Sequence, residues 1–250
     1  MAKKIISTLL VALMCIALLC ACTPGQDTTT TTANPQPSAS QSTDPQPTDP
    51  PKEEVKEIKI SDYLGKDVWE DDGGDVSIKD DHILFDNAFM GDFAALRLTE
   101  KAQNVTYKFS IQLSDIPTDL SEEAGTWWDS ELIIVGRSAV AGNSYQSGDQ
   151  KGYCLTAWGD LGKVYIGRAG YDDAFGSVEW NVNDGQPHDI EFTLTNNEDN
   201  TQVTIVLKVD GQVIFEGVDD GSKVKQERPA LYPDEGGFTI RCKYFKAIVK

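Results

Sequence analysis

The stretch Val203-Thr204-Ile205-Val206-Leu207-Lys208-Val209-Asp210-Gly211-Gln212-Val213-Ile214-Phe215 decides the fold class. Apolar residues occupy every second position before Asp210-Gly211, as in a strand with one buried face. The Asp-Gly pair accepts the positive φ angles of a tight reversal. We therefore predict two antiparallel strands joined by a hairpin at Asp210.

Similar runs fill the chain from Glu54 onward, and helix signals are almost absent. Turn residues separate them, for example Asp72-Gly73-Gly74 and Asn183-Asp184-Gly185. Many short strands in one domain predict an all-β fold, an antiparallel two-sheet jelly-roll sandwich over residues 54–250. The expected strands cover residues 76–78, 82–85, 94–98, 105–113, 132–135, 153–158, 163–168, 190–194, 203–209, 213–215 and 238–249.

The N-terminus has the features of a lipoprotein signal peptide. Lys3-Lys4 precede an uncharged apolar run that ends in Leu19-Cys20-Ala21-Cys22. The last four residues resemble the lipobox of bacterial lipoproteins. The resemblance implies cleavage after Ala21, a lipid anchor on Cys22 that includes palmitate, and a location on the extracellular face of the cell membrane. An ordinary signal peptide or an uncleaved anchor helix is the alternative.

Residues 22–53 form the next segment, which is rich in Thr, Ser, Gln, Asp and Pro. It has no aromatic residue and too little apolar surface to offset the entropy of ordering. We predict a disordered linker between the lipidated cysteine and the domain.

Composition narrows the choice of partners and cofactors. The formal net charge is −18, from 40 acidic and 22 basic residues, which disfavours nucleic acid and anionic lipid headgroups as partners. The two histidines cannot supply a three-histidine zinc site. Cys154 and Cys242 lie in strand-like segments, so we expect two buried thiols, and the sequence leaves a disulfide between them open.

The C-terminal third resembles a known family. Its order is the segment Gln186 to Leu194, the hairpin from Val203 to Phe215, and Gly236-Gly237-Phe238-Thr239-Ile240. This order is similar to the closing strands of concanavalin A-like lectin/glucanase jelly rolls, in the laminin G-like branch. The resemblance implies the fold more firmly than the function.

Glucanases with this fold carry two glutamates and an aspartate at alternate positions of one strand. The nearest match here is Trp127-Trp128-Asp129-Ser130-Glu131-Leu132-Ile133, in which Asp129 and Glu131 would share a strand face. Ile133 stands where the third carboxylate belongs. The catalytic motif is therefore incomplete, and a glycoside-active enzyme that uses Asp129 and Glu131 is the alternative to a non-catalytic domain.

Aromatic and acidic residues crowd the middle of the chain. Sugar rings stack their apolar faces on Trp or Tyr, while carboxylates bind hydroxyl groups. We therefore predict a non-catalytic carbohydrate-binding domain whose ligand is a polysaccharide or cell-wall glycan, with a structural or protein-interaction module as a further alternative. The predicted binding residues are Trp127, Trp128, Asp129, Glu131, Trp158, Tyr171 and Trp180.

A calcium site is the remaining alternative. Asp71, Asp72 and Asp75 offer the hard oxygen ligands that calcium takes. The same residues are also common in turns for conformational reasons, which is the favoured interpretation. The sequence establishes no cofactor.

Overall fold

The structure is a computed structural model that describes residues 54–71, 73–87, 93–115, 130–139, 151–159, 161–169, 174–222 and 235–250. All of them belong to the unit Pro50–Lys250, the second of two units in the chain. The predicted signal peptide, Cys22 and the linker lie outside the described residues. Among the residues that are described, no helix is long and apolar enough to cross a membrane.

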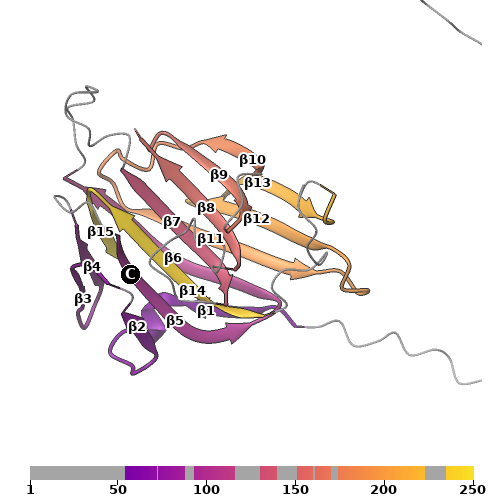
Figure 1. The fold of residues 1–250 in the computed structure, drawn as a ribbon, viewed down its shortest axis with the longest axis horizontal. Coiled ribbons are helices and arrows are strands. Elements are labelled where there is room, and N and C mark those ends of the chain that lie inside the picture. The colour runs from indigo at the N-terminus through magenta and orange to yellow at the C-terminus, as the bar shows by residue number, and fades with distance from the viewer. Residues whose placement is uncertain are drawn as a thin grey trace, which may run out of the picture. The chain divides into compact units, whose positions relative to one another are not determined.

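The described chain forms two β-sheets, which confirms the predicted sandwich (Figure 1). Sheet A runs in the order β13 (Gln212–Asp219), β12 (Val203–Val209), β11 (His188–Asn196), β6 (Val105–Ser114), β15 (Lys246–Val249), β4 (Ile83–Asp86) and β3 (Val76–Ile78), and β1 (Lys56–Lys59) also pairs with β6. Sheet B runs in the order β10 (Ala174–Glu179), β9 (Lys163–Arg168), β8 (Tyr153–Trp158), β7 (Glu131–Ser138), β14 (Gly236–Lys243), β5 (Ala94–Ala102) and β2 (Trp69–Asp71). A short 3₁₀ helix, η1 (Ile60–Tyr63), follows β1.

Alternation along the strands builds the core between the sheets. Residues of β6 are alternately buried and half-buried, as period-two patterning requires. Tyr107 of β6 stacks on Phe238 of β14, with 4.8 Å between ring centroids. The Tyr107 hydroxyl donates to the carbonyl of Gly237 at 3.0 Å and accepts the backbone N–H of Arg137 at 3.0 Å. A buried polar group is thus satisfied by a bridge from sheet A to two strands of sheet B.

The structure refines the predicted strands in two ways. The run 238–249 divides at Tyr244, where φ is 65°, so that β14 lies in sheet B and β15 in sheet A. Sequence reasoning also missed β1, β2 and β10, which are short or mostly exposed. β1 pairs with β6 in parallel, whereas every other strand pair described is antiparallel.

Cys154 and Cys242 are both buried free thiols, as expected, and no disulfide joins them. Cys242 points into the main core, whereas Cys154 belongs to a second cluster on the other face of sheet B. Strand β7 also separates their strands, so their side chains lack the geometry of a disulfide. Burial raises the pKa of the Cys154 thiol to about 11, which keeps it protonated at neutral pH.

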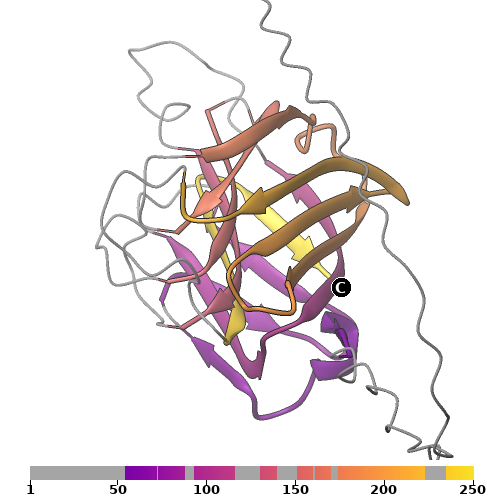
Figure 2. The same cartoon turned by 90° about the vertical axis from the view of Figure 1, so that its right-hand side faces the viewer.

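A buried ion pair joins the sheets near one edge. Nε and Nη2 of Arg168, on β9, both lie 2.6 Å from Asp219 Oδ2 at the end of β13. The Tyr153 hydroxyl on β8 donates to the same oxygen at 2.9 Å. Figure 2 looks onto this side of the sandwich, where the late strands β11 to β13 are drawn in orange.

Replacement of Asp219 should destabilise the fold strongly. An Asp219→Ala variant leaves Arg168 buried opposite no carboxylate, and we expect the free energy of unfolding to fall by about 3–5 kcal/mol. Tyr153→Phe removes one hydrogen bond and should cost only about 1 kcal/mol. Chemical denaturation of both variants checks the ranking, and equal losses would contradict the inter-sheet role of the pair.

Candidate functional site

The outer face of sheet B is buried in its middle. Cross-strand neighbours there include Thr239, Val135 and Cys154 in one line and Arg241, Ile133 and Thr156 in the next. Each of these side chains is at most 3% exposed. Phe93 packs against this face, and the Arg241 guanidinium lies 4.4 Å from its ring centroid.

The third line of side chains on this face is open, and we call it the rim row. It begins with Lys243, Glu131 and Trp158, which are direct cross-strand neighbours on β14, β7 and β8. Paired Lys163 and Glu179 continue it on β9 and β10, with 3.3 Å between the ammonium and the carboxylate. All five residues are half-buried or exposed, in contrast to the two buried lines beside them.

Trp158 of the rim row stacks on Tyr165, which lies in the neighbouring line of side chains, opposite Thr156. Their rings are 4.6 Å apart between centroids and only 2° from parallel. Trp158 is 44% exposed, and within the described residues it is the only aromatic among the exposed large hydrophobic side chains. Lys163 Nζ lies 5.7 Å from the Tyr165 ring centroid. We call Trp158 and Tyr165 the aromatic platform.

The structure describes three of the seven predicted binding residues, Glu131, Trp158 and Trp180. Glu131 and Trp158 are brought together as cross-strand neighbours. Trp127, Trp128, Asp129 and Tyr171 lie outside the described residues. Tyr165 was not predicted as a binding residue, and the signal that could have found it is the β8–β9 hairpin, which sets Thr156 opposite Tyr165 and so Trp158 diagonal to it.

The structure corrects the assignment of Trp180 as a sugar-binding residue. Trp180 is 8% exposed and belongs to the core cluster between the sheets. Its ring meets the His188 ring edge-on, with 5.8 Å between centroids. No broad ring face is left for a sugar, because the segment after β10 turns this side chain inward.

Glu131 alone of the proposed catalytic pair is described. The next residues on its face are Ile133 and Val135, both fully buried. Strand β7 therefore continues with two apolar side chains where a retaining glucanase would place further carboxylates. Among the described residues of β7, Glu131 is therefore the one carboxylate on this face.

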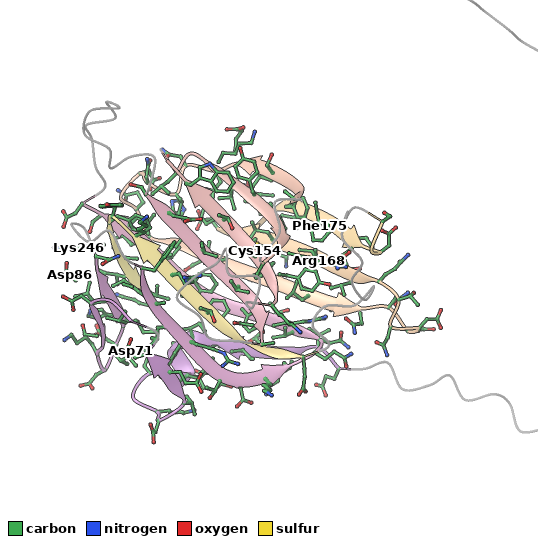
Figure 3. All side chains as sticks on the ribbon, in the orientation of Figure 1. Asp71, Asp86, Cys154, Arg168, Phe175 and Lys246 are labelled. Atoms are coloured by element: carbon green, nitrogen blue, oxygen red, sulfur yellow. The ribbon has the colours of Figure 1, made fainter. Side chains whose placement is uncertain are left out.

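The acidic turn proposed for calcium lies away from the platform. Asp71 is at the β2 edge of sheet B, on the opposite side from Phe175 of β10 (Figure 3). Asp72 is not described, and Asp71 Oδ1 accepts the backbone N–H of Gly73 at 2.9 Å, as a turn residue does. Within the described ranges, no group of three or more His, Cys, Asp or Glu side chains is placed to hold a metal ion.

His188 lies between two carboxylates near the platform strands. Its Nδ1 is 2.8 Å from Asp210 Oδ2 and its Nε2 is 3.1 Å from Asp184 Oδ1. Burial lowers the pKa of His188, but the hydrogen bonds to Asp210 and Asp184 outweigh it and raise the pKa above the ordinary value. Asp210 is 22 residues away in the sequence, so only the fold brings it to His188.

Comparison with known proteins identifies the fold. No protein-family model matches the chain, and no curated protein matches it. Among solved structures, the carbohydrate-binding module CBM66 from Bacillus subtilis aligns with a TM-score of 0.51 and 10% identity, over 73% of this chain and 92% of the module. The chain shares that module's fold. It is an all-β jelly roll.

Two further solved jelly rolls are similar at lower scores. The Crh5 transglycosylase in complex with NAG gives a TM-score of 0.49 at 12% identity, over 76% of this chain and 79% of the enzyme. Peanut lectin gives 0.40 at 13% identity, over 74% of this chain and 92% of the lectin.

Protonation of His188 should contribute to stability in a defined pH window. Because the folded-state pKa is raised, the contribution is complete below the unfolded value of about 6.5 and is lost as pH rises through the folded value. We expect the difference in unfolding free energy between wild type and His188→Gln to shrink from pH 6 to pH 9. His82→Gln is the matched control, since His82 contacts one carboxylate, Asp81, whereas His188 contacts two. A difference that stays constant with pH would contradict the assignment.

Proposed function

We propose that this protein is a surface-anchored lipoprotein whose jelly-roll domain binds carbohydrate without cleaving it. The observation that carries the proposal is the exposed Trp158 ring, which stacks parallel to half-buried Tyr165 beside Glu131. A sugar ring presents C–H groups on one face and hydroxyl groups at its edge. The platform offers an aromatic surface for the first and a carboxylate for the second.

The fold supports the same proposal. The aligned Bacillus subtilis structure is a carbohydrate-binding module, and the likeness covers most of that module. The platform lies at the end of β8 and the start of β9, on rigid strands rather than on a long loop. Strand-borne side chains hold their spacing well, which suits recognition of a repeating polymer.

The anchor part of the proposal rests on Cys22. Lys3-Lys4, the apolar run and Leu19-Cys20-Ala21-Cys22 together form the expected lipoprotein signal. Lipidation would attach the chain to the extracellular face of the cell membrane, and residues 22–53 would space the domain from the lipid surface. A polysaccharide or cell-wall glycan would then be within reach.

Loss of the aromatic platform should weaken glycan binding. On a glycan array, with and without calcium, the full chain in mild detergent should bind at least one saccharide class. Trp158→Ala should raise Kd about tenfold, which corresponds to about 1.4 kcal/mol. Val218→Ala is the control, because Val218 has the same 44% exposure but lies on sheet A.

If the wild-type chain binds no saccharide on the array, the carbohydrate-binding proposal is refuted. Glu131→Gln separates the enzymatic alternative from the proposal, because it keeps the shape of the side chain and removes its charge. Release of reducing sugar by wild type that disappears in this variant would establish a glycoside-active enzyme instead.

Mass spectrometry of the mature N-terminus tests the anchor. We expect the chain to begin at Cys22 with a diacylglycerol thioether and to partition into the detergent phase. Cys22→Ala should abolish both properties, whereas Cys20→Ser, in the same segment, should retain them. A mature chain without lipid on Cys22 would rule out the anchor and leave the binding proposal unaffected.

A further inference from the structure

The segment between β10 and β11, residues 180–187, is hydrogen-bonded to the turn that follows Trp158. The backbone N–H of Trp180 donates to Gly162 O at 3.2 Å, and that of Val182 donates to Leu161 O at 3.3 Å. Leu161 N–H in turn donates to Trp158 O at 3.3 Å. The position of segment 180–187 is therefore linked, through one short turn, to the aromatic platform.

The other end of this segment is held by His188. Asp184, within the segment, contacts His188 Nε2, and Asp210, in the β12–β13 turn, contacts Nδ1. Carboxylate oxygens at neutral pH only accept hydrogen bonds, and a neutral imidazole has a single N–H. Both contacts can be hydrogen bonds only when the ring is an imidazolium. The neutral ring must give up one of them.

Asp184 and Asp210 are the charged groups that contact the His188 ring in the described residues. Asp210 Oδ1 also accepts the backbone N–H of Asp189 at 2.9 Å, so that carboxylate is fixed in place. From β6, the neutral Gln112 donates to Gly185 O at 2.8 Å, and from the segment itself the Trp180 ring packs edge-on. The His188 side chain is 13% exposed and its partners Asp184 and Asp210 are 38% and 53% exposed, so the ring can exchange protons with solvent.

We propose that His188 is a positioning residue for saccharide binding, which in its protonated form keeps segment 180–187 against the Leu161-Gly162 turn and so holds Trp158 in place. Glycan affinity then falls as the medium becomes alkaline. The inference rests on the proposed carbohydrate binding at Trp158 and Tyr165, and it adds a proton as a regulator of that site. Neither His188 nor the two aspartates need touch the sugar.

Two variants separate the charge from the fold. His188→Gln removes the titrating group, so its glycan affinity should be low and independent of pH between 6 and 9. Asp210→Asn places an amide N–H opposite Nδ1 while its carbonyl can still accept the Asp189 N–H. A neutral ring then satisfies both partners, and this variant should keep high affinity at pH 9. The positive φ of 51° at Asp210 is also one that asparagine tolerates.

The experiment has two readouts on the full chain in mild detergent. The first readout needs no ligand and consists of two measurements. One is the hydrogen-exchange protection of the Trp180 and Val182 amides, corrected for the intrinsic exchange rate. The other is the NMR resonance of the Trp158 indole N–H, which is assigned by its loss in Trp158→Phe. Both should change with the titration of His188 in wild type and stay constant in Asp210→Asn. The second is glycan Kd, which should rise about fivefold from pH 6 to pH 9 in wild type, at the low end of coupling between sites.

Each outcome decides the inference. If amide protection and the Trp158 resonance of wild type do not change with pH, the inference is overturned, whether or not any glycan binds. A pH-independent Kd together with titrating protection would also overturn it, because the segment would move without affecting the platform. If no glycan binds at any pH, the proposed function fails, and the Trp158 resonance alone still tells whether His188 positions that ring.

Discussion

The ion pair between Arg168 and Asp219 ties the strands of the candidate site to the opposite sheet. Arg168 ends β9 and Tyr153 begins β8, and both bind one oxygen of Asp219 on sheet A. A charge buried without its partner would cost several kcal/mol, so these ends of β8 and β9 are fixed relative to β13. The opposite ends of the same two strands lie five residue steps, or about 17 Å, away and carry Trp158 and Lys163. Trp158 and Lys163 of the rim row thus lie at the turn end of a hairpin whose other end is held by the buried ion pair.

Burial on both faces of sheet B explains where the site can be. Strand β7 reads Leu132-Ile133-Ile134-Val135, and all four side chains are at most 2% exposed. An antiparallel strand usually has one wet face, so a continuous apolar run marks a strand that is covered on both sides. The middle of the described outer face is therefore buried, and Glu131, Trp158 and Tyr165 are solvent-accessible near its edge.

Local sequence patterns were sufficient for most of the fold but for only part of the site. Alternating strands and the Asp210-Gly211 turn depend on neighbours in the chain, and they appear where predicted. Glu131 and Trp158 could be named from their residue types, but their pairing depends on the register of β7 and β8. Trp180 was misassigned because an aromatic residue looks the same in sequence whether it lines a core or a surface. The contacts of His188 were out of reach, since Asp210 is 22 residues away and meets it only through tertiary packing.

The parallel pairing of β1 has a mechanical consequence for a tethered protein. Lys56 to Lys59 are the first strand after the linker, and they run alongside β6 from Val105 to Lys108. A load between a lipid anchor and a bound polymer would pull on the Lys56 end of β1. The force would act parallel to β1 and β6, toward their N-terminal ends. Hydrogen bonds loaded in this way share the shear force, whereas those of a hairpin pulled open from one end break in succession. Under the lipid anchor proposed at Cys22, the parallel pairing of β1 with β6 would therefore resist tension.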